Sequence, residues 1–302
     1  MRACATERGA RAALLVLLAL GALAPLRSSA LQLQDDEQDT LELPGPAQRI
    51  VSLAPGATAM LFAAGAGAKV VGTTAYSVEP EAARKVERIG DALSFDLERI
   101  LALHPDVVVV WGSGTSATQI ARLQNVGLRI YHHRLRRLDD IPVSLQRLGR
   151  LAGTEQVARA AAAQYAQQIA SLRAQYRQQT PATVLLQVWD RPIYTIGRPE
   201  IMTDVVNACG DRNLYDDLTD PSPAVTLESV LARNPQIILA LAPDAKSGER
   251  WASAWKAFPT LRAVQAGRVI AWSDQRLSRL GPSIVDAATD LCRALRAPMP
   301  HS

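Results

Sequence analysis

The sequence predicts an α/β protein of two Rossmann-like lobes, each with a parallel sheet, joined by one long backbone helix. Two observations predict this class. In both halves of the 302-residue chain, short apolar runs alternate with helical segments, and Gly or Pro separates them. Between the halves, residues 154–178 contain neither Gly nor Pro and carry apolar side chains at helical spacing.

The first thirty residues have the pattern of a secretory signal peptide. Three arginines precede an apolar stretch over 12–26, and small residues at 28–30 offer a cleavage site. An apolar stretch of about 15 residues is short for a membrane anchor, which needs about 20. We therefore expect that residues 1–30 are removed and that the mature protein is exported.

Charge and composition exclude two broad classes. Hydrophobic residues make up 48% of the chain and charged residues 21%, a globular profile that excludes wholesale disorder. The formal charge of +4 falls to +1 once residues 1–30, with four arginines and one glutamate, are removed. A nearly neutral mature chain lacks the basic surface that nucleic acid requires, so we expect no nucleic-acid partner.

The mature chain keeps two of the three cysteines, Cys209 and Cys292. An even number of cysteines in an exported protein favours a disulfide bond. Two buried free thiols are the alternative.

The first lobe is expected over residues 48–150, after a flexible lead-in over residues 31–47 that is acidic and rich in Gly and Pro at its end. Apolar and β-branched runs predict its strands at 50–53, 70–72, 107–110 and 128–131. Helical segments between these runs predict helices at 58–64, 97–103 and 118–125.

The linking helix is expected within residues 151–180, and the second lobe over 181–298. In that lobe an apolar run predicts a strand at 184–188, and a helix is expected at 201–208. The segment Leu97–Val107 returns 130 positions later as Leu227–Ile237, with the same Leu, Glu, Leu, Ala and Pro positions. This repeat indicates that each lobe contains the same helix–strand unit.

The sequence contains no nucleophile elbow, phosphate-binding loop or zinc-protease motif, so we expect no catalytic site. His104, His132, His133 and His301 are the histidines of the mature chain. Neighbouring residues of a strand point to opposite faces, so His132 and His133 are interpreted as a solvated strand end, and no metal site is expected.

Several aromatic and polar residues follow predicted strands, where the carboxyl ends of an open α/β sheet form a binding crevice. They are Tyr76, Trp111, Tyr194, and Asp274, Gln275, Arg276 and Arg279 in one loop. Aromatic faces with a few polar groups suit a large, flat, partly apolar ligand. Edge-of-core packing for the aromatic residues, and a surface ion pair for Arg279, are the alternatives.

Glu98 and Glu228 occupy matching positions near the start of repeated helices. The helix dipole alone explains an acid at such a position. Two matched carboxylates, one in each lobe, would also suit a two-fold symmetric partner that presents Arg or Lys.

Taken together, these residues resemble the periplasmic substrate-binding proteins of ABC importers whose lobes are joined by a helix, and among them the cobalamin receptors. The resemblance covers residues 48–296. The segments that carry it are Arg49–Pro55, Tyr76-Ser77, Leu97–Ile100, Trp111, Tyr194-Thr195, Ala208–Gly210, Val230–Arg233, Ser273-Asp274 and Leu291-Cys292.

The resemblance implies a periplasmic, monomeric, non-enzymatic receptor without a cofactor, which passes a corrinoid to an importer. It implies ligand contacts from Tyr76 and Trp111 in the first lobe, and from Tyr194 and the loop 274–279 in the second. It also implies a Cys209–Cys292 disulfide, and salt bridges from Glu98 and Glu228 to arginines of the permease.

This chain departs from the cobalamin receptors at three places. Asp91-Ala92 and Pro221-Ser222-Pro223 stand where the family has tryptophans, and the loop after Asp274 lacks the family's aromatic residues. Haem, with Tyr76 as an axial ligand, and an iron–siderophore, with Arg276 or Arg279 facing its acidic groups, are therefore alternative ligands. A secreted enzyme on the same scaffold and a receptor for a protein partner are alternatives from other classes.

Overall fold

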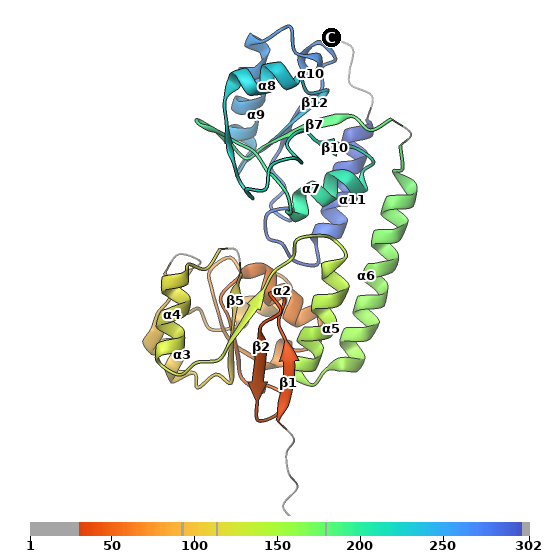
Figure 1. The fold of residues 1–302 in the computed structure, drawn as a ribbon. Helices are drawn as coiled ribbons and strands as arrows, with labels where there is room; N and C mark the ends of the chain where they lie inside the picture. Colours follow the sequence, from red (N-terminus) through yellow and green to blue (C-terminus); the bar gives the residue numbers. More distant parts are fainter. Residues whose placement is uncertain (1–29, 92–93, 113, 179, 298–302) are drawn as a thin grey trace, which may run out of the picture.

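The computed structural model describes residues 30–91, 94–112, 114–178 and 180–297. The signal peptide expected over residues 1–30 lies outside this range apart from Ala30. Two α/β lobes lie one above the other, and helix α6 (Glu155–Gln175) runs along one side of both (Figure 1). This helix falls within the range predicted from the missing Gly and Pro, and its 21 residues span about 32 Å.

The first lobe is built on a parallel sheet with the strand order β4-β3-β5-β6. Its strands are β3 (Ile50–Ser52), β4 (Val70–Thr73), β5 (Val107–Trp111) and β6 (Ile130–His133). Its helices are α2 (Pro55–Ala63), α3 (Leu97–Ala102), α4 (Ala117–Asn125) and α5 (Asp140–Ala152), with short 3-10 turns at Gly67–Lys69 and Glu81–Lys85. The four consecutive valines of β5 are fully buried, as expected for a strand that is covered on both faces.

The second lobe contains a parallel sheet with the order β10-β7-β12-β13 and a small antiparallel sheet with the order β11-β9-β8. The strands are β7 (Thr183–Gln187), β8 (Trp189–Asp190), β9 (Ile193–Tyr194), β10 (Arg212–Asn213), β11 (Ala224–Val225), β12 (Ile237–Leu241) and β13 (Val269–Trp272). The helices are α7 (Ile201–Ala208), α8 (Leu227–Arg233), α9 (Ala245–Ala254), α10 (Arg262–Gln265) and α11 (Ile284–Arg296), with a 3-10 turn at Trp255–Ala257. Two parallel sheets with helices between their strands confirm the predicted fold class.

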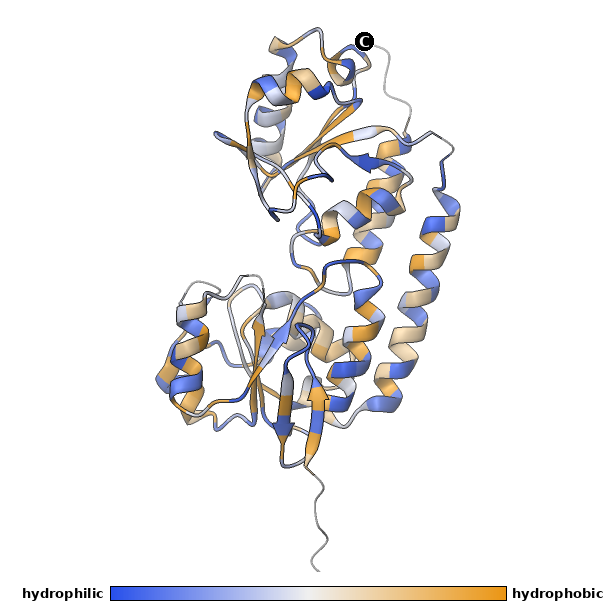
Figure 2. Ribbon diagram, viewed as in Figure 1, coloured by the Kyte–Doolittle hydropathy of each residue, from blue (hydrophilic) through white to orange (hydrophobic). Residues whose placement is uncertain are grey.

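The hydrophobic core extends through both lobes. One cluster of buried residues takes in Met60 of α2, Leu145 of α5, Ile169 of α6, Val205 of α7 and Leu291 of α11. The central strands β5 and β12 are also hydrophobic, whereas β10 is hydrophilic (Figure 2). Because a close-packed core resists deformation, this cluster limits how far the lobes can turn relative to each other.

The disulfide between Cys209 and Cys292 is present, as the two cysteines of the mature chain suggested. It joins the C-terminal end of α7 to α11, and its Cα atoms lie 4.9 Å apart. Both residues are fully buried. The bond therefore ties together α7 and α11, two helices of the second lobe that lie beside α6.

The expectation that residues 31–47 form a flexible lead-in is wrong for most of that segment. Residues 31–43 form a hairpin of β1 (Leu31–Gln34) and β2 (Thr40–Leu43), which pair antiparallel. Leu33, Leu41 and Leu43 are buried in the core, so the alternating leucines of this segment form an amphipathic pair of strands. The acidic residues that suggested disorder lie at the tip of the hairpin, where they bind β6 and α5.

Candidate functional site

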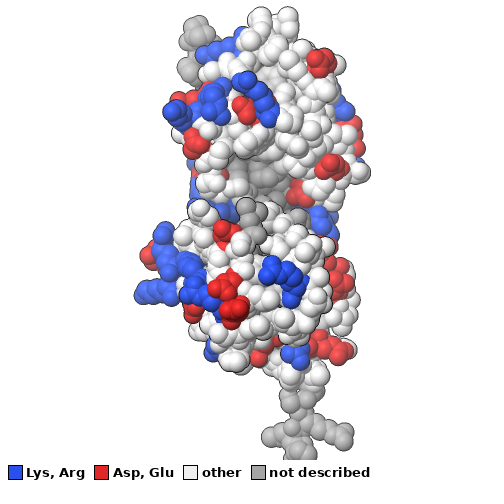
Figure 3. Space-filling view, turned by 90° about the vertical axis from the view of Figure 1, so that its left-hand side faces the viewer, with Lys and Arg blue, Asp and Glu red and all other residues white. Residues whose placement is uncertain are grey.

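The carboxyl ends of the two sheets approach each other, and the segments that follow them carry contacts between the lobes. Arg134, which follows β6, lies 3.7 Å from Glu200 of the second lobe. Arg279, in the loop after β13, pairs with Glu79 of the first lobe. Between the lobes the surface is hollowed (Figure 3). These edges are where the sequence predicted ligand contacts.

Tyr76 projects from the first lobe on a turn that buried hydroxyl groups hold in place. Its own side chain is 77% exposed, and its φ of 66° lies in the left-handed region. The next residue, Ser77, is fully buried and accepts a hydrogen bond of 2.9 Å from Thr73, while Arg88 donates to its carbonyl oxygen. An ordered turn that leaves a large ring in solvent fits a ligand contact better than core packing.

Trp111 ends β5 and is the second exposed aromatic residue of this edge, at 36%. Its backbone N–H donates to the Thr115 hydroxyl group at 3.2 Å. A Cβ built on Gly114 would lie 1.8 Å from the indole ring, so a glycine is needed there for the ring to lie against the chain. The glycine therefore permits this position of the indole ring.

The second lobe contributes an apolar pocket of about 380 Å³. Asp274 and Gln275, predicted as ligand contacts, line it, together with Trp189, Trp272, Met202, Leu241, Leu280 and other residues. Trp272 ends β13 and Leu241 ends β12, so both side chains lie at the carboxyl edge of the sheet. Sequence reasoning named no site role for Trp272, although its place at a strand end was a usable signal.

Two further aromatic residues of the second lobe lie on its small sheet. Trp189 is 50% exposed, and its ring packs edge-on against Trp251 with a centroid distance of 6.0 Å. Tyr194 pairs with Trp189 across β9 and β8 and is 36% exposed. Tyr194 does not line the 380 Å³ pocket, whereas Trp189 does.

The arginines of the loop after β13 are both engaged by acids of the chain itself. The Arg276 guanidinium donates to Asp274 at 2.9 Å and to Asp290 at 2.7 Å. The hydrogen bonds that Arg276 donates to these two carboxylates raise its pKa. Arg279 pairs with Glu79 of the other lobe. The ion pair that the sequence analysis left open as an alternative for Arg279 is therefore present. Its partner, Glu79, lies 200 positions away in the sequence.

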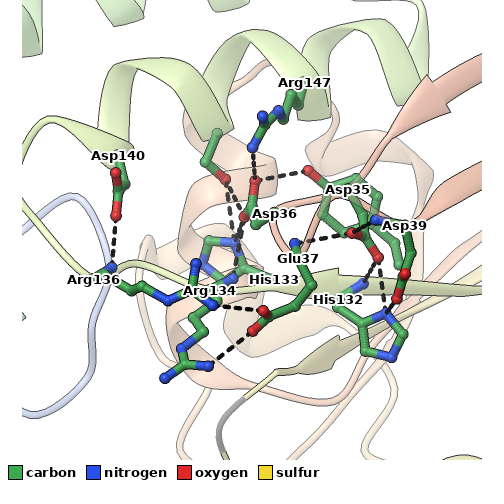
Figure 4. A network of polar contacts seen from close by, with 12 residues as sticks. Asp35, Asp36, Glu37, Asp39, His132, His133, Arg134, Arg136, Asp140 and Arg147 are labelled. Atoms are coloured by element: carbon green, nitrogen blue, oxygen red, sulfur yellow. Dashed lines mark hydrogen bonds and ion pairs between the residues drawn. The ribbon is translucent and has the colours of Figure 1, made fainter. Parts of the chain in front are cut away.

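A chain of charged groups lies at the edge of the cleft beside the hairpin tip. Glu37 accepts a hydrogen bond of 3.1 Å from Arg134 and one of 2.6 Å from Arg136 (Figure 4). Arg134 also faces Glu200 of the second lobe. Burial raises the pKa of Glu200, and the nearby Arg134 and Arg136 oppose that rise. Sequence reasoning missed this group because it assigned Glu37 to a flexible segment.

The interpretation of His132 and His133 as a solvated strand end is wrong. His133 is buried and lies 2.9 Å from Asp36, and His132 is mostly buried and lies 2.8 Å from Asp35 (Figure 4). The hydrogen bond that the His132 ring makes to the Asp35 carboxylate raises the pKa of His132. The two rings do point to different sides, but the hairpin tip supplies an acid for each of them.

Asp35, Asp39 and His132 each place one possible metal-ligand atom within 4.8 Å of the others. Asp35 already accepts hydrogen bonds from the backbone amides of Glu37, Asp39 and His132. These hydrogen bonds and the contact with the His132 ring explain why the three side chains lie together. We therefore interpret the group as a structural ion pair that holds the hairpin on β6.

Glu98 and Glu228 are both exposed and lie in the first turns of α3 and α8. The side chains of Asp96 and Thr226 cap these helices, each accepting from the backbone amide three residues later. Neither glutamate forms an ion pair within the described part of the chain. Acidic and basic side chains gather on both lobes, on either side of the hollow (Figure 3).

Among the helices of the described ranges, none is both long enough and apolar enough to cross a membrane.

Comparisons with known proteins give the family. Residues 50–276 match the model of the periplasmic binding protein family. A vitamin B12-binding protein of Vibrio cholerae is 34% identical over 256 residues, which are 85% of this chain and 92% of that protein. The crystal structure of the periplasmic vitamin B12 binding protein BtuF of Vibrio cholerae superposes with a TM-score of 0.75 at 33% identity, covering 85% of this chain and 100% of that one.

A haem-binding relative is also similar. The periplasmic heme-binding protein RhuT from Roseiflexus sp. RS-1 gives a TM-score of 0.69 at 26% identity, covering 82% of this chain and 98% of that one. The family match over most of the chain, the shared fold and the two facing sheet edges lead to one conclusion: the chain belongs to the periplasmic binding protein family.

Proposed function

We propose that this protein is a periplasmic, non-enzymatic receptor that captures a cobalamin-type corrinoid between its lobes and delivers it to an ABC importer. The observation that carries this proposal is the 34% identity, over nearly the full length, with a protein named for binding vitamin B12. The apolar pocket and the exposed aromatic side chains at the facing edges support a large ligand with flat, apolar parts. The receptor acts as a monomer and holds no cofactor of its own.

In this proposal the ligand lies between Tyr76 and Trp111 of the first lobe and the edge of the second. On the second lobe, Tyr194 and the loop that carries Asp274, Gln275, Arg276 and Arg279 border it. Trp189 and Trp272 are added to these residues, because both line the apolar pocket at that edge. The two tryptophans replace, at different positions, aromatic surface that this chain lacks relative to the cobalamin receptors.

Titration of the purified mature protein tests the ligand. We expect cyanocobalamin to bind with a Kd below about 10 μM, equivalent to roughly 7 kcal/mol, and to be recovered chemically unchanged. Haemin and a ferric siderophore, titrated in parallel by calorimetry, are expected to bind more weakly. Tight haemin binding without cyanocobalamin binding would identify haem as the ligand in place of a corrinoid. The similarity to RhuT makes haem the alternative to test.

Removing the ring of Trp189 tests the proposed pocket. Trp189→Ala is expected to weaken cyanocobalamin binding at least about tenfold, because a half-exposed tryptophan at a ligand edge supplies a large contact area. Val143→Ala on α5 is the control, since this exposed apolar residue lies outside the pocket. Equal affinities for the two variants would place the ligand elsewhere.

We propose that Glu98 and Glu228 dock the loaded receptor on the permease, where each pairs with a basic side chain. Their exposure, their lack of an ion pair in the described ranges and their matching positions in the two lobes support this role. A permease with two-fold symmetry would meet both carboxylates at once.

The double variant Glu98→Gln/Glu228→Gln is expected to bind ligand normally but to dock on the permease at least about tenfold more weakly. Binding to the cognate permease in nanodiscs measures this effect. Glu249→Gln, an exposed glutamate on α9, is the matched control. If the double variant docks as well as this control, the two glutamates have no part in docking and only stabilise the first turns of their helices.

A further inference from the structure

Residues 279–283, the last part of the connection between β13 and α11, rest on the first lobe. A Cβ built on Gly56 would lie 2.2 Å from the carbonyl oxygen of Arg279 and 2.6 Å from that of Leu280. A Cβ built on Gly281 would lie 3.4 Å from the Cα atom of Gly56. The backbones of the two lobes therefore meet at Gly56 and Gly281, neither of which has a side chain. We call this contact the glycine joint. A Cβ at Gly56 would force the two backbones apart.

A polar contact closes over this glycine joint. The Glu79 carboxylate of the first lobe accepts a hydrogen bond from Arg279 and a second one, of 2.9 Å, from the Ser283 hydroxyl group. Ser283 precedes the 13-residue helix α11, so Glu79 lies near the positive end of that helix. The side chains of Glu79 and Arg279 are only about one third exposed, which makes their attraction stronger than that of a surface pair.

The glycine joint and the contact above it lie close in sequence to residues of both walls of the cleft. Tyr76 is three residues before Glu79 on the wall of the first lobe. Leu280, which follows Arg279, lines the apolar pocket of the second lobe. A change in the spacing at the joint would therefore move both walls relative to each other.

Other contacts at the cleft favour a single fixed spacing. Arg134 faces Glu200 across the lobes at 3.7 Å, and the backbone amide of Leu138 donates to Asp204 of α7 at 2.8 Å. With the glycine joint, the lobes are tied on more than one side. Several contacts between two lobes restrict their relative motion, and a site that is preorganised in this way binds ligand at a lower entropic cost.

We propose that Glu79, Arg279 and Ser283 form a latch that, together with the other contacts between the lobes, sets the width of the cleft, and that Arg279 affects ligand affinity through Glu79 instead of touching the ligand. Arg279 is then a positioning residue. Its loop borders the ligand, but its guanidinium is held by an acid of the opposite lobe. The part of this inference that concerns affinity rests on the proposed function, whereas the part that concerns cleft width does not.

Distances between spin labels measure the cleft width in ligand-free protein. Labels attached to cysteines introduced at Gln124 of α4 and Glu249 of α9, both exposed, report the spacing of the lobes by pulsed electron paramagnetic resonance. We expect one narrow distance distribution for the wild-type latch. Glu79→Gln and Arg279→Met are each expected to broaden it. Arg279→Lys, which keeps the charge, is expected to restore part of the narrow distribution.

Gly56→Ala provides an independent way to open the joint with the polar latch intact. Its added methyl group would meet backbone carbonyl groups that belong to the other lobe. Gly248→Ala in α9 is the control, because the nearest atom to its Cβ is a methyl carbon at 3.3 Å within the same lobe. We expect Gly56→Ala to shift the mean distance and Gly248→Ala to leave it unchanged. Should Gly56→Ala fail to fold, the Glu79 and Arg279 variants still decide the question.

Affinity separates the latch from a direct contact. Glu79→Gln and Arg279→Met are each expected to weaken cyanocobalamin binding by roughly three- to tenfold, and the double variant by no more than either alone. If Arg279→Met weakens binding while Glu79→Gln does not, Arg279 contacts the ligand and the proposal is wrong. Unchanged distance distributions in all latch variants would also overturn it. Wild-type protein that does not bind cyanocobalamin refutes the proposed function, while the distances still test the latch.

Discussion

Replacing Asp36 by Ala is expected to lower the free energy of unfolding by about 3–5 kcal/mol, because it leaves buried charged and polar partners without their acceptor. The Asp36 side chain is only 3% exposed. Its carboxylate accepts hydrogen bonds from Tyr131, His133, Ser144 and Arg147 and from the backbone amide of Arg134 (Figure 4). Urea denaturation of the mature protein, followed by circular dichroism, measures the change.

Asp39→Ala is the matched control for this prediction. Asp39 lies in the same hairpin and also faces a histidine, but its side chain is 72% exposed and its oxygen lies 3.5 Å from His132. Exposed pairs contribute about 0–1 kcal/mol, so Asp39→Ala should change stability little. Equal losses for the two variants would show that burial adds nothing to the network at Asp36.

The second large effect is expected from the disulfide. Replacing both Cys209 and Cys292 by Ala is expected to destabilise the protein by about 4–5 kcal/mol, because the bond closes a loop over a sequence separation of 83 residues and so restricts the unfolded chain. Thermal or urea unfolding of the oxidised protein and of the variant gives the difference. The cavity left by two buried sulfur atoms adds to the loss.

A reductant serves as the control for the disulfide prediction. It should lower the unfolding midpoint of the wild-type protein and leave that of the double variant unchanged. A wild-type midpoint that does not respond to complete reduction, verified by thiol titration, would mean that the packed core alone holds α7 on α11.

Several strands and helices were predictable because they follow from local patterns. The four valines at 107–110 identify a buried strand, and Thr180-Pro181 limits the long helix α6. The repeat of Leu97–Val107 at Leu227–Ile237 predicted equivalent helix–strand units, which appear as α3–β5 and α8–β12. Periodicity and turn residues act within a few positions, so a single chain displays them directly.

Part of the candidate site was also within reach of the sequence. Asp274 and Gln275 were chosen because they follow a strand, and both line the apolar pocket. Trp272 ends that same strand, yet the sequence analysis gave it no role in the site. Position at a carboxyl edge identifies a candidate, but which side chain faces a cavity depends on the twist of the sheet and on its neighbours.

The sequence alone determined the fold class, the long helix and which strand ends carry aromatic and polar side chains. Only the tertiary structure decided the partners of the charged groups: Asp36 with His133, and Arg279 with Glu79, 200 positions away. It also turned the acidic lead-in into a buried hairpin tip. Local patterns report the preferences of the backbone, whereas a buried charge is stable only where folding brings an opposite charge to it, and no local pattern encodes that meeting.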